Sequence, residues 1–372
     1  MNLRSDLFGR ALSLLLAASL AAFASACGGV KPVGKGGDGG ATTAPGGTVR
    51  LQGTGATFPM PVYQKWVSEY GKAHPNVQID YQSTGSGTGI NQISSGTVDF
   101  GASDKPMTDD ELKKAQGELL HIPTVLGAVA VTFNLPGVND LKLSGPTLAN
   151  IYLGKVTKWN DPAIASENPG ANLPDANIIV AARADGSGTS AVFTDFLSKV
   201  SPEWKGQVGT GTNPNWPTGQ RARGNEGVTA VVKQNPNSIG YVEQIYAEQQ
   251  KLPVAAVRNA SGNFVKPTLD SVTSAAAAAL PATPEDMRVS ITDPQGAPDA
   301  YPISSYTYVL VYKDQRDAVK GRALVDFLWW ALHDGTEHAR ALSYAPLPEE
   351  VRRRTEQKLN SITANGQPVR GA

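Results

Sequence analysis

The sequence is poor in cysteine and has no excess of either charge. Cys27 is the only cysteine among 372 residues, so no disulfide can form within the chain. Lysine plus arginine and aspartate plus glutamate each number 33, which gives a net charge of zero. Because nucleic-acid binding usually needs a basic face, this balance argues against a nucleic-acid partner. It does not argue against a small anion, which backbone dipoles and one arginine can hold.

Motifs for hydrolysis and for metal binding are also lacking. The four histidines have no spacing typical of a catalytic base or a metal site. His333 and His338 are five residues apart, whereas a metal site on one helix face needs four. Ser187 lies between two glycines, but the Gly-x-Ser-x-Gly nucleophile motif is absent there. We therefore expect no enzyme activity, no metal and no cofactor, with a phosphatase or other hydrolase as the alternative.

The N-terminal apolar run is too short to cross a membrane. Residues 11–26 are apolar and follow Arg4 and Arg10, whereas a spanning helix needs about 20 such residues. This length and the basic flank are typical of a signal peptide, which we place at residues 1–26. The remaining chain is long enough for two domains, and the sequence, which is 40% hydrophobic, has enough apolar residues to form their cores.

Cys27 follows the small residues Ala24, Ser25 and Ala26, as the lipidated cysteine of bacterial lipoproteins does. This pattern predicts lipidation of Cys27, although leucine is commoner than alanine at position 24. The alternative is ordinary cleavage after Ala-x-Ala, which leaves a soluble protein. Residues 27–47 are rich in glycine without apolar periodicity, which predicts a flexible tether between a lipid anchor and the folded body.

A glycine-rich turn between a strand and a helix is the most informative stretch. Residues 178–180 are a β-type run, residues 182–190 read Ala-Arg-Ala-Asp-Gly-Ser-Gly-Thr-Ser, and a helical pattern follows. Gly186 and Gly188 carry no Cβ that would block a close ligand, and unpaired N–H groups at a helix start attract anions. Arg183 adds a planar fork that fits two oxygens of an oxyanion. The stretch predicts an anion site.

The order of strand, polar turn and helix also occurs three times earlier in the chain. The first two turns are residues 53–59 and 82–89, and the third follows a strand that ends at Asp104 and precedes a helix capped by Thr108. One such junction alone would be an ordinary capped turn. In open α/β sheets, however, ligands bind at the carboxyl ends of strands, so four polar junctions predict one shared site.

Three of these stretches resemble the phosphate-binding protein of the bacterial high-affinity phosphate ABC transporter. They are residues 53–59 (Gly-Thr-Gly-Ala-Thr-Phe-Pro), 99–104 (Asp-Phe-Gly-Ala-Ser-Asp) and 183–189 (Arg-Ala-Asp-Gly-Ser-Gly-Thr). The resemblance runs in order from about residue 51 to residue 353 and so covers the folded body. Supporting stretches are residues 151–155, 158–160, 239–243 and 344–348.

The resemblance implies a two-lobed α/β fold of the periplasmic-binding-protein type. Each lobe is a mixed sheet flanked by helices, and the ligand lies in the cleft between the lobes. Lobe 1 is expected at residues 48–133 and 300–372, and lobe 2 at residues 134–299. The implied function is that of an extracytoplasmic solute-binding protein, lipid-anchored at the bacterial cell membrane. It would capture inorganic phosphate and deliver it to the permease subunits of an ABC transporter for import.

The resemblance also implies a set of site residues. Backbone N–H groups of the first turn and the Thr57 hydroxyl contact phosphate, and Ser86 donates from its hydroxyl and N–H. Arg183 binds from the other lobe, and Asp104 accepts the phosphate proton. Gly87 departs from the family, many of whose members have a second serine there. The implied phosphate-binding residues are Ala56, Thr57, Phe58, Ser86, Asp104, Arg183, Asp185, Ser187, Gly188 and Thr189.

Asp104 is expected to select the anion. A carboxylate only accepts hydrogen bonds, so it favours phosphate, which carries a proton near neutral pH, and repels sulfate. Such a mismatch can discriminate by factors on the order of 10⁴–10⁵. The alternative function is a receptor for another oxyanion, such as sulfate or molybdate. Simpler roles are a helix-capping carboxylate for Asp104 and a surface salt bridge between Arg183 and Asp185.

Overall fold

The structure is a computed structural model that describes residues 47–370. The predicted signal peptide, the lipidation of Cys27 and all of the predicted tether except residue 47 lie outside the described residues. The described residues belong to one compact unit, Pro45–Ala372.

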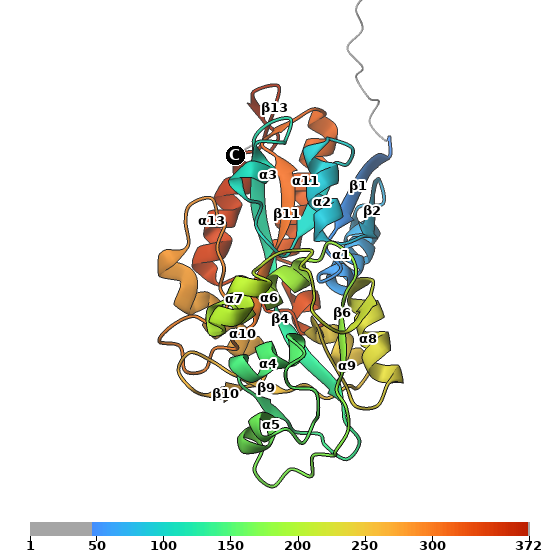
Figure 1. The fold of residues 1–372 in the computed structure, drawn as a ribbon. Coiled ribbons are helices and arrows are strands. Elements are labelled where there is room, and N and C mark those ends of the chain that lie inside the picture. The colour runs from blue at the N-terminus through green and yellow to red at the C-terminus, as the bar shows by residue number, and fades with distance from the viewer. Residues whose placement is uncertain (1–46, 371–372) are drawn as a thin grey trace, which may run out of the picture. The chain divides into compact units, whose positions relative to one another are not determined.

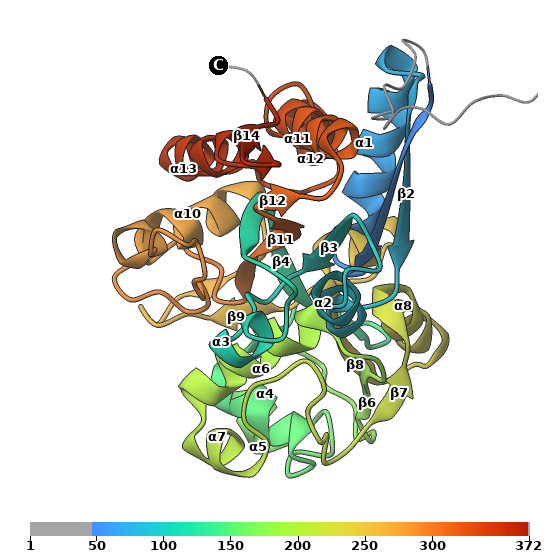
Figure 2. The same ribbon diagram turned by 90° about the horizontal axis from the view of Figure 1, so that it is seen from above.

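An eight-stranded mixed sheet is the centre of the fold, with the strand order β2-β1-β3-β11-β4-β8-β6-β7 (Figures 1 and 2). β1 runs parallel to β2 and β3, and β6 runs parallel to β7 and β8. β11 and β4 lie between these two groups and are antiparallel to their neighbours. The strands are β1 (Val49–Gly55), β2 (Val77–Ser83), β3 (Phe100–Ser103), β4 (Leu119–Asn134), β6 (Ile179–Arg183), β7 (Gln220–Ala222), β8 (Ser238–Glu243) and β11 (Ser304–Tyr312).

The long strand β4 joins the two groups of strands. It pairs with β11 through residues 119–128 and with β8 from Val129 to Asn134. All of its 16 residues except Asn134 are buried, as a nearly continuous apolar run predicts. β4 therefore takes part in both halves of the sheet, and its hydrogen-bond partner changes at Val129.

Helices pack on both groups of strands in the sheet. α2 contacts β1 and β3, α11 contacts β1, α8 contacts β6 and β8, and α10 and α13 contact β4. The helices are α1 (Met60–Ala73), α2 (Ser86–Ser94), α3 (Asp109–Leu112), α4 (Gly145–Tyr152), α5 (Pro162–Glu167), α6 (Gly188–Val200), α7 (Pro202–Gln207), α8 (Gly224–Gln234), α9 (Gln244–Gln249), α10 (Leu269–Ala279), η1 (Leu280–Ala282), α11 (Ala318–Leu332), α12 (Thr336–Arg340) and α13 (Glu349–Asn360).

Two helix starts carry clear local signals. α1 has a proline in its first turn and buries Val62, Trp66 and Tyr70, which recur at helical spacing. Thr108 caps α3 in a capping box with Glu111, so the predicted cap is confirmed. Because Thr108 performs this role, Asp104 is not the capping residue of α3.

Two small three-stranded sheets complete the structure of the described residues. They have the orders β10-β9-β5 and β12-β13-β14. Their strands are β5 (Lys142–Leu143), β9 (Ala256–Arg258), β10 (Phe264–Val265), β12 (Asp314–Gln315), β13 (Thr363–Ala364) and β14 (Gln367–Pro368).

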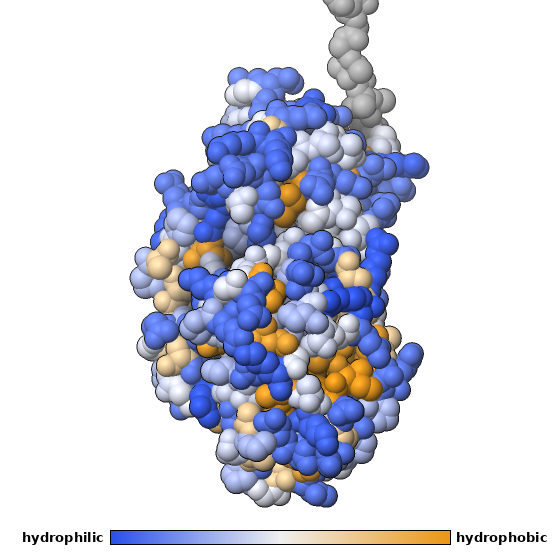
Figure 3. All heavy atoms as spheres, in the orientation of Figure 1, coloured by the Kyte–Doolittle hydropathy of each residue, from blue (hydrophilic) through white to orange (hydrophobic). Residues whose placement is uncertain are grey.

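Apolar side chains are mostly inside the fold. Trp66, Trp159 and Trp204 are fully buried, and the only large hydrophobic side chain exposed within residues 47–370 is Val319. The face in Figure 3 is accordingly mostly hydrophilic, with apolar side chains in separate small areas. None of the helices between residues 47 and 370 combines the length and apolarity that a membrane span requires.

The predicted α/β fold class, with a mixed sheet flanked by helices, is confirmed. The four predicted strand-to-helix junctions are also present, as β1–α1, β2–α2, β3–α3 and β6–α6. The predicted lobe limits stay a prediction.

Candidate anion-binding site

The four polar junctions meet at one place. The Gly87 N–H, at the start of α2, donates to the Gly186 carbonyl, before α6, over 2.9 Å. A Cβ added to Gly188 would lie 2.6 Å from Asp104 Oδ2 and still closer to Ser86 Oγ. Only glycine therefore lets the start of α6 approach this closely to the ends of β2 and β3. The ten predicted site residues all belong to these junctions.

Three tyrosines, two of them buried and Tyr246 partly buried, hold the first junction by its carbonyl oxygens. The hydroxyl of Tyr81 donates to the Ala56 carbonyl, that of Tyr246 to the Thr57 carbonyl and that of Tyr344 to the Phe58 carbonyl, each over 2.6 Å. Burial raises the pKa of all three tyrosines, so they stay neutral donors.

Two N–H groups of this junction have no partner in the described part of the chain. The Thr57 and Phe58 N–H groups donate to no acceptor among residues 47–370. The Ala56 N–H, in contrast, donates to the Ala102 carbonyl over 3.0 Å and is already satisfied. In this structure Thr57 and Phe58 therefore offer free donors, whereas Ala56 does not.

Asp104 is buried with one oxygen unsatisfied. Its Oδ1 accepts a hydrogen bond from the Thr307 hydroxyl over 2.9 Å, and its backbone N–H donates to Ser86 Oγ over 3.3 Å. Its Oδ2 has no hydrogen-bond partner among the described residues, although it is shielded from solvent. Burial raises the pKa of Asp104 to about 7, against the lowering effects of Thr307, Arg183 and Ser86. A buried, unpaired acceptor is costly unless a ligand satisfies it.

Arg183 presents one edge of its guanidinium group to the site. Asp185 holds the other edge, with Nε 2.8 Å from Oδ1 and Nη2 2.5 Å from Oδ2. Nη1 lies 3.4 Å from the Thr189 hydroxyl oxygen. The Arg183 side chain is only 1% exposed, which excludes the surface salt bridge considered from the sequence. Burial alone would raise the pKa of Asp185, but the Arg183 partner leaves it lowered.

The N-terminus of α6 supplies further donors. The Ser187 hydroxyl oxygen caps the helix by accepting from the Ser190 N–H over 3.0 Å, and the Ser187 N–H donates to the Thr212 carbonyl. The N–H groups of Gly188 and Thr189 have no acceptor in the described part of the chain. They lie at the positive end of a 13-residue helix, where anions are stabilised.

Several residues of the site were not predicted from the sequence. Asn225, in the first turn of α8, is fully buried and donates to the hydroxyl oxygens of Thr57 and Thr189. Thr307, on β11, supplies the donor to Asp104. A signal existed for Asn225, because it follows β7 at a strand-to-helix junction that resembles the other four. Thr307 and the three tyrosines lie far from the junctions in the sequence, so no local pattern pointed to them.

The arrangement defines the chemistry that the site can perform. Backbone N–H groups, hydroxyls and one guanidinium edge are donors, and among the ten predicted site residues the buried side-chain acceptor that lacks a partner is Asp104 Oδ2. This set fits a small oxyanion that carries a proton. No group of three potential metal-ligating side chains occurs within residues 47–370.

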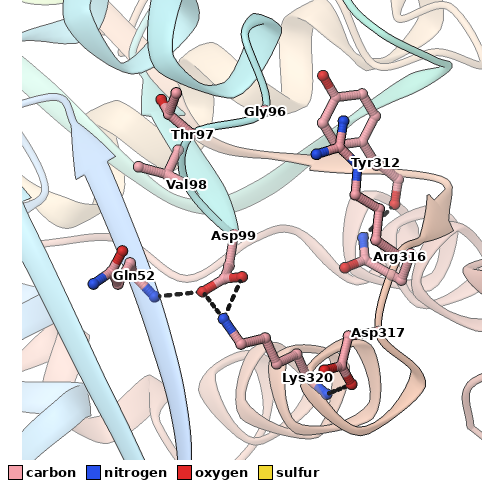
Figure 4. A pocket seen from close by; sticks show the side chains of 10 residues that line it. Gln52, Gly96, Thr97, Val98, Asp99, Tyr312, Arg316, Asp317 and Lys320 are labelled. Atoms are coloured by element: carbon pink, nitrogen blue, oxygen red, sulfur yellow. Dashed lines mark hydrogen bonds and ion pairs between the residues drawn. The ribbon is translucent and has the colours of Figure 1, made fainter.

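A separate hollow, of about 350 Å³, lies near the start of β3 rather than its end (Figure 4). Two of its charged groups are paired with each other: Lys320 Nζ lies 3.0 Å and 3.1 Å from the two carboxylate oxygens of Asp99. Asp99 also accepts from the Gln52 N–H over 2.8 Å. Asp99, although part of the stretch 99–104, therefore has a structural role away from the junctions.

The fold and site can now be compared with known proteins. Residues 42–334 match the model of the PBP superfamily domain. The phosphate-binding protein PstS of Pasteurella multocida is 47% identical over 303 residues, which cover 81% of this chain and 87% of that protein. The PstS of Methanocaldococcus jannaschii is 42% identical, covering 82% and 84% of the two chains.

Solved structures agree on the fold. A phosphate-binding protein from Stenotrophomonas maltophilia superposes with a TM-score of 0.65 at 21% identity, covering 83% of this chain and 93% of that chain. An ancestral soluble variant of the human phosphate-binding protein gives a TM-score of 0.68 at 21% identity, covering 86% and 99%. The chain thus belongs to the PBP superfamily and, within it, to the family of the PstS phosphate-binding proteins.

Proposed function

We propose that this protein is an extracytoplasmic solute-binding protein that captures inorganic phosphate and delivers it to an ABC transporter permease for import. The observation that carries the proposal is the unsatisfied Oδ2 of buried Asp104, which faces the free donors of the α6 N-terminus. The names of the PstS relatives support the same ligand.

The hydrogen-bond donors of the site attract the anion, and the Asp104 acceptor selects which anion binds. The N–H groups of Thr57, Phe58, Gly188 and Thr189, with the free edge of Arg183, attract any tetrahedral anion. Asp104 accepts from the phosphate proton. Because burial raises the pKa of Asp104 to about 7, the carboxyl and phosphate share one proton near neutral pH. Sulfate brings no proton, so above pH 7, where Asp104 is mostly ionised, it meets the carboxylate unfavourably.

We propose further that binding closes two lobes. Residues 48–133 and 300–372 would form one lobe and residues 134–299 the other, with β4 and β11 at the crossing. Hydrogen bonds already join the two sides at the site, including those from Asn225 and Tyr246 to Thr57. An anion held by Thr57 and Asp104 on one side and by Arg183 on the other would favour the closed state.

We propose that a lipid anchor keeps the protein near the membrane. Lipidation of Cys27 and a tether at residues 27–47 would keep the folded body at the extracytoplasmic face of the cell membrane, within reach of the permease subunits. A binding role without catalysis fits the site, because the Ser187 hydroxyl oxygen caps α6. Within residues 47–370, no histidine is hydrogen-bonded to Ser187.

The phosphate content of the purified protein tests this function. Acid denaturation of the native protein should release about one phosphate per chain. The variant Arg183→Ala should release almost none, because losing a charged hydrogen-bond donor costs roughly 100-fold or more in affinity. Arg322→Ala is the matched control, since the Arg322 side chain is 63% exposed and its one ion pair among the described residues is with Asp326, over 3.4 Å. Release of sulfate, or of no anion, would contradict the proposal.

A further inference from the structure

Asn225 has its amide orientation determined by the backbone. Its Oδ1 accepts a hydrogen bond from the Glu243 N–H over 3.0 Å. Because an N–H group needs an acceptor, the oxygen of the amide must face Glu243, and the nitrogen must face the site. Asn225 is fully buried, so no solvent competes for its two N–H hydrogens.

Those two hydrogens each go to a threonine hydroxyl from a different junction. Nδ2 lies 2.8 Å from the Thr57 hydroxyl oxygen and 3.2 Å from that of Thr189. Thr57 follows β1, Thr189 is in the first turn of α6, and Asn225 is in the first turn of α8. One side chain therefore ties together three of the segments that form the site.

The lone pairs of both hydroxyls are thereby occupied. The Thr57 hydroxyl oxygen accepts from Asn225 Nδ2 and, over 3.3 Å, from the Asn225 backbone N–H. The Thr189 hydroxyl oxygen accepts from Asn225 Nδ2 and, over 3.4 Å, from Arg183 Nη1. A hydroxyl has two lone pairs and one proton, so each oxygen can now act only as a donor. Neither proton has an acceptor among the described residues.

From this geometry we propose that Asn225 is a positioning residue that turns the Thr57 and Thr189 hydroxyls into obligate donors toward the bound anion. The inference rests on the proposed phosphate-receptor function and extends it. Asn225 does not contact the ligand in this scheme. It sets the direction of two hydroxyl protons before phosphate arrives, which lowers the ordering cost of binding.

The substitution Asn225→Asp tests the direction of these protons. An ionised carboxylate only accepts, so it would take both hydroxyl protons and turn lone pairs toward phosphate. Calorimetric titration of the phosphate-free protein with inorganic phosphate at pH 8 should show an affinity roughly 10³-fold below wild type. Asn172→Asp is the matched control, because Asn172 is exposed and the same change there should leave the affinity unaltered.

A pH series separates this role from a structural one. The introduced carboxyl is buried beside an anion, so its pKa rises above the usual value of about 4, and it regains a proton to donate as the pH falls. The ratio of wild-type to Asn225→Asp affinity should therefore shrink between pH 8 and pH 5.5. We expect a change of about tenfold or more, since one hydrogen bond to a charged ligand contributes about that much to the affinity. A ratio that is the same at every pH would overturn the inference.

A double-mutant cycle supplies a second test, through the hydroxyl itself. Asn225→Ala should weaken phosphate binding by roughly 100-fold in the wild-type background, but at least about tenfold less in a Thr57→Val background, where one hydroxyl is absent. If Asn225→Ala weakens phosphate binding equally in both backgrounds, the inference about Asn225 is wrong. The receptor function still stands in that case, provided that the wild-type protein binds phosphate. Failure of the wild-type protein to bind phosphate would contradict both.

Discussion

At the scale of single residues, Asp104 is the group on which selectivity depends. Its Oδ2 is buried and has no partner within residues 47–370, while the other site groups are donors. Attraction for a tetrahedral anion therefore comes from many groups, but the choice between anions comes from one. This separation lets the two properties be changed independently.

Replacing the carboxyl by an amide should remove the choice. Asp104→Asn puts a donor where sulfate needs one, so the preference for phosphate over sulfate should fall by roughly tenfold or more at pH 8. Competition titrations of the phosphate-free variant with both anions measure this ratio. An unchanged preference would show that another group selects the anion.

The raised pKa of Asp104 also predicts a pH dependence of stability. In the folded, phosphate-free protein this pKa is about 7, whereas in the unfolded chain it returns to about 4. Between these values the folded state binds the extra proton, so the free energy of unfolding falls as the pH rises from 4 to 7.

Denaturant unfolding of wild type and Asp104→Asn at several pH values isolates this contribution. The wild-type free energy of unfolding should decline relative to that of the variant as the pH rises through this window, by an amount on the order of a few kcal/mol. A difference that is constant with pH, or that grows in favour of wild type at higher pH, would refute the burial effect.

At the scale of elements, the N-terminal turn of α6 must come close to the ends of β2 and β3. A Cβ on Gly188 would lie 2.6 Å from Asp104 Oδ2. Gly188→Ala should therefore push the two sides of the site apart and weaken phosphate binding by roughly 100-fold or more, because a misplaced donor set loses several hydrogen bonds. Calorimetry provides the measurement.

The control for this change is Gly206→Ala in α7, where an added Cβ meets nothing within 4 Å. That variant should bind phosphate as wild type does and be as stable or slightly more stable, since alanine favours a helix. Wild-type affinity in Gly188→Ala would mean that the close approach is not needed for binding.

The elements also show what the sequence could and could not predict. Strand-to-helix junctions are local patterns, so glycines, hydroxyls and caps identified β1–α1, β2–α2, β3–α3 and β6–α6. The ten candidate site residues came from the resemblance to the phosphate-binding family. The tyrosines that anchor the first junction, such as Tyr344, lie up to 286 residues away and reach it only through the fold. Thr307 likewise contacts Asp104 across 203 residues. The sequence could have identified Asn225 as part of a fifth strand-to-helix junction. Its contacts with both Thr57 and Thr189, however, follow only from the three-dimensional structure.

At the scale of the whole molecule, β4 and β11 connect two groups of parallel strands, and the site lies where hydrogen bonds link the groups. Tyr246, in α9, donates to the Thr57 carbonyl, and Gly87 donates to Gly186. Since phosphate would add bonds from both sides, it should shift the protein toward the closed state.

Small-angle X-ray scattering can follow this closure. The radius of gyration of the phosphate-free protein should decrease when phosphate is added, and it should not change when the same amount of chloride is added. A radius of gyration that phosphate leaves unaltered would argue that the two groups of strands form one rigid body and that binding needs no closure.

The account depends most on the claim that one buried carboxyl makes this a phosphate receptor rather than a general oxyanion receptor. The direct measurement is the ratio of phosphate to sulfate affinity of the wild-type, phosphate-free protein, determined by calorimetry at pH 8. We predict a ratio of about tenfold or more that rises further with pH, because sulfate leaves the ionised Asp104 acceptor unpaired and can avoid this only if Asp104 takes up a proton, which costs about tenfold for each pH unit above its pKa. Comparable affinities for the two anions would contradict it.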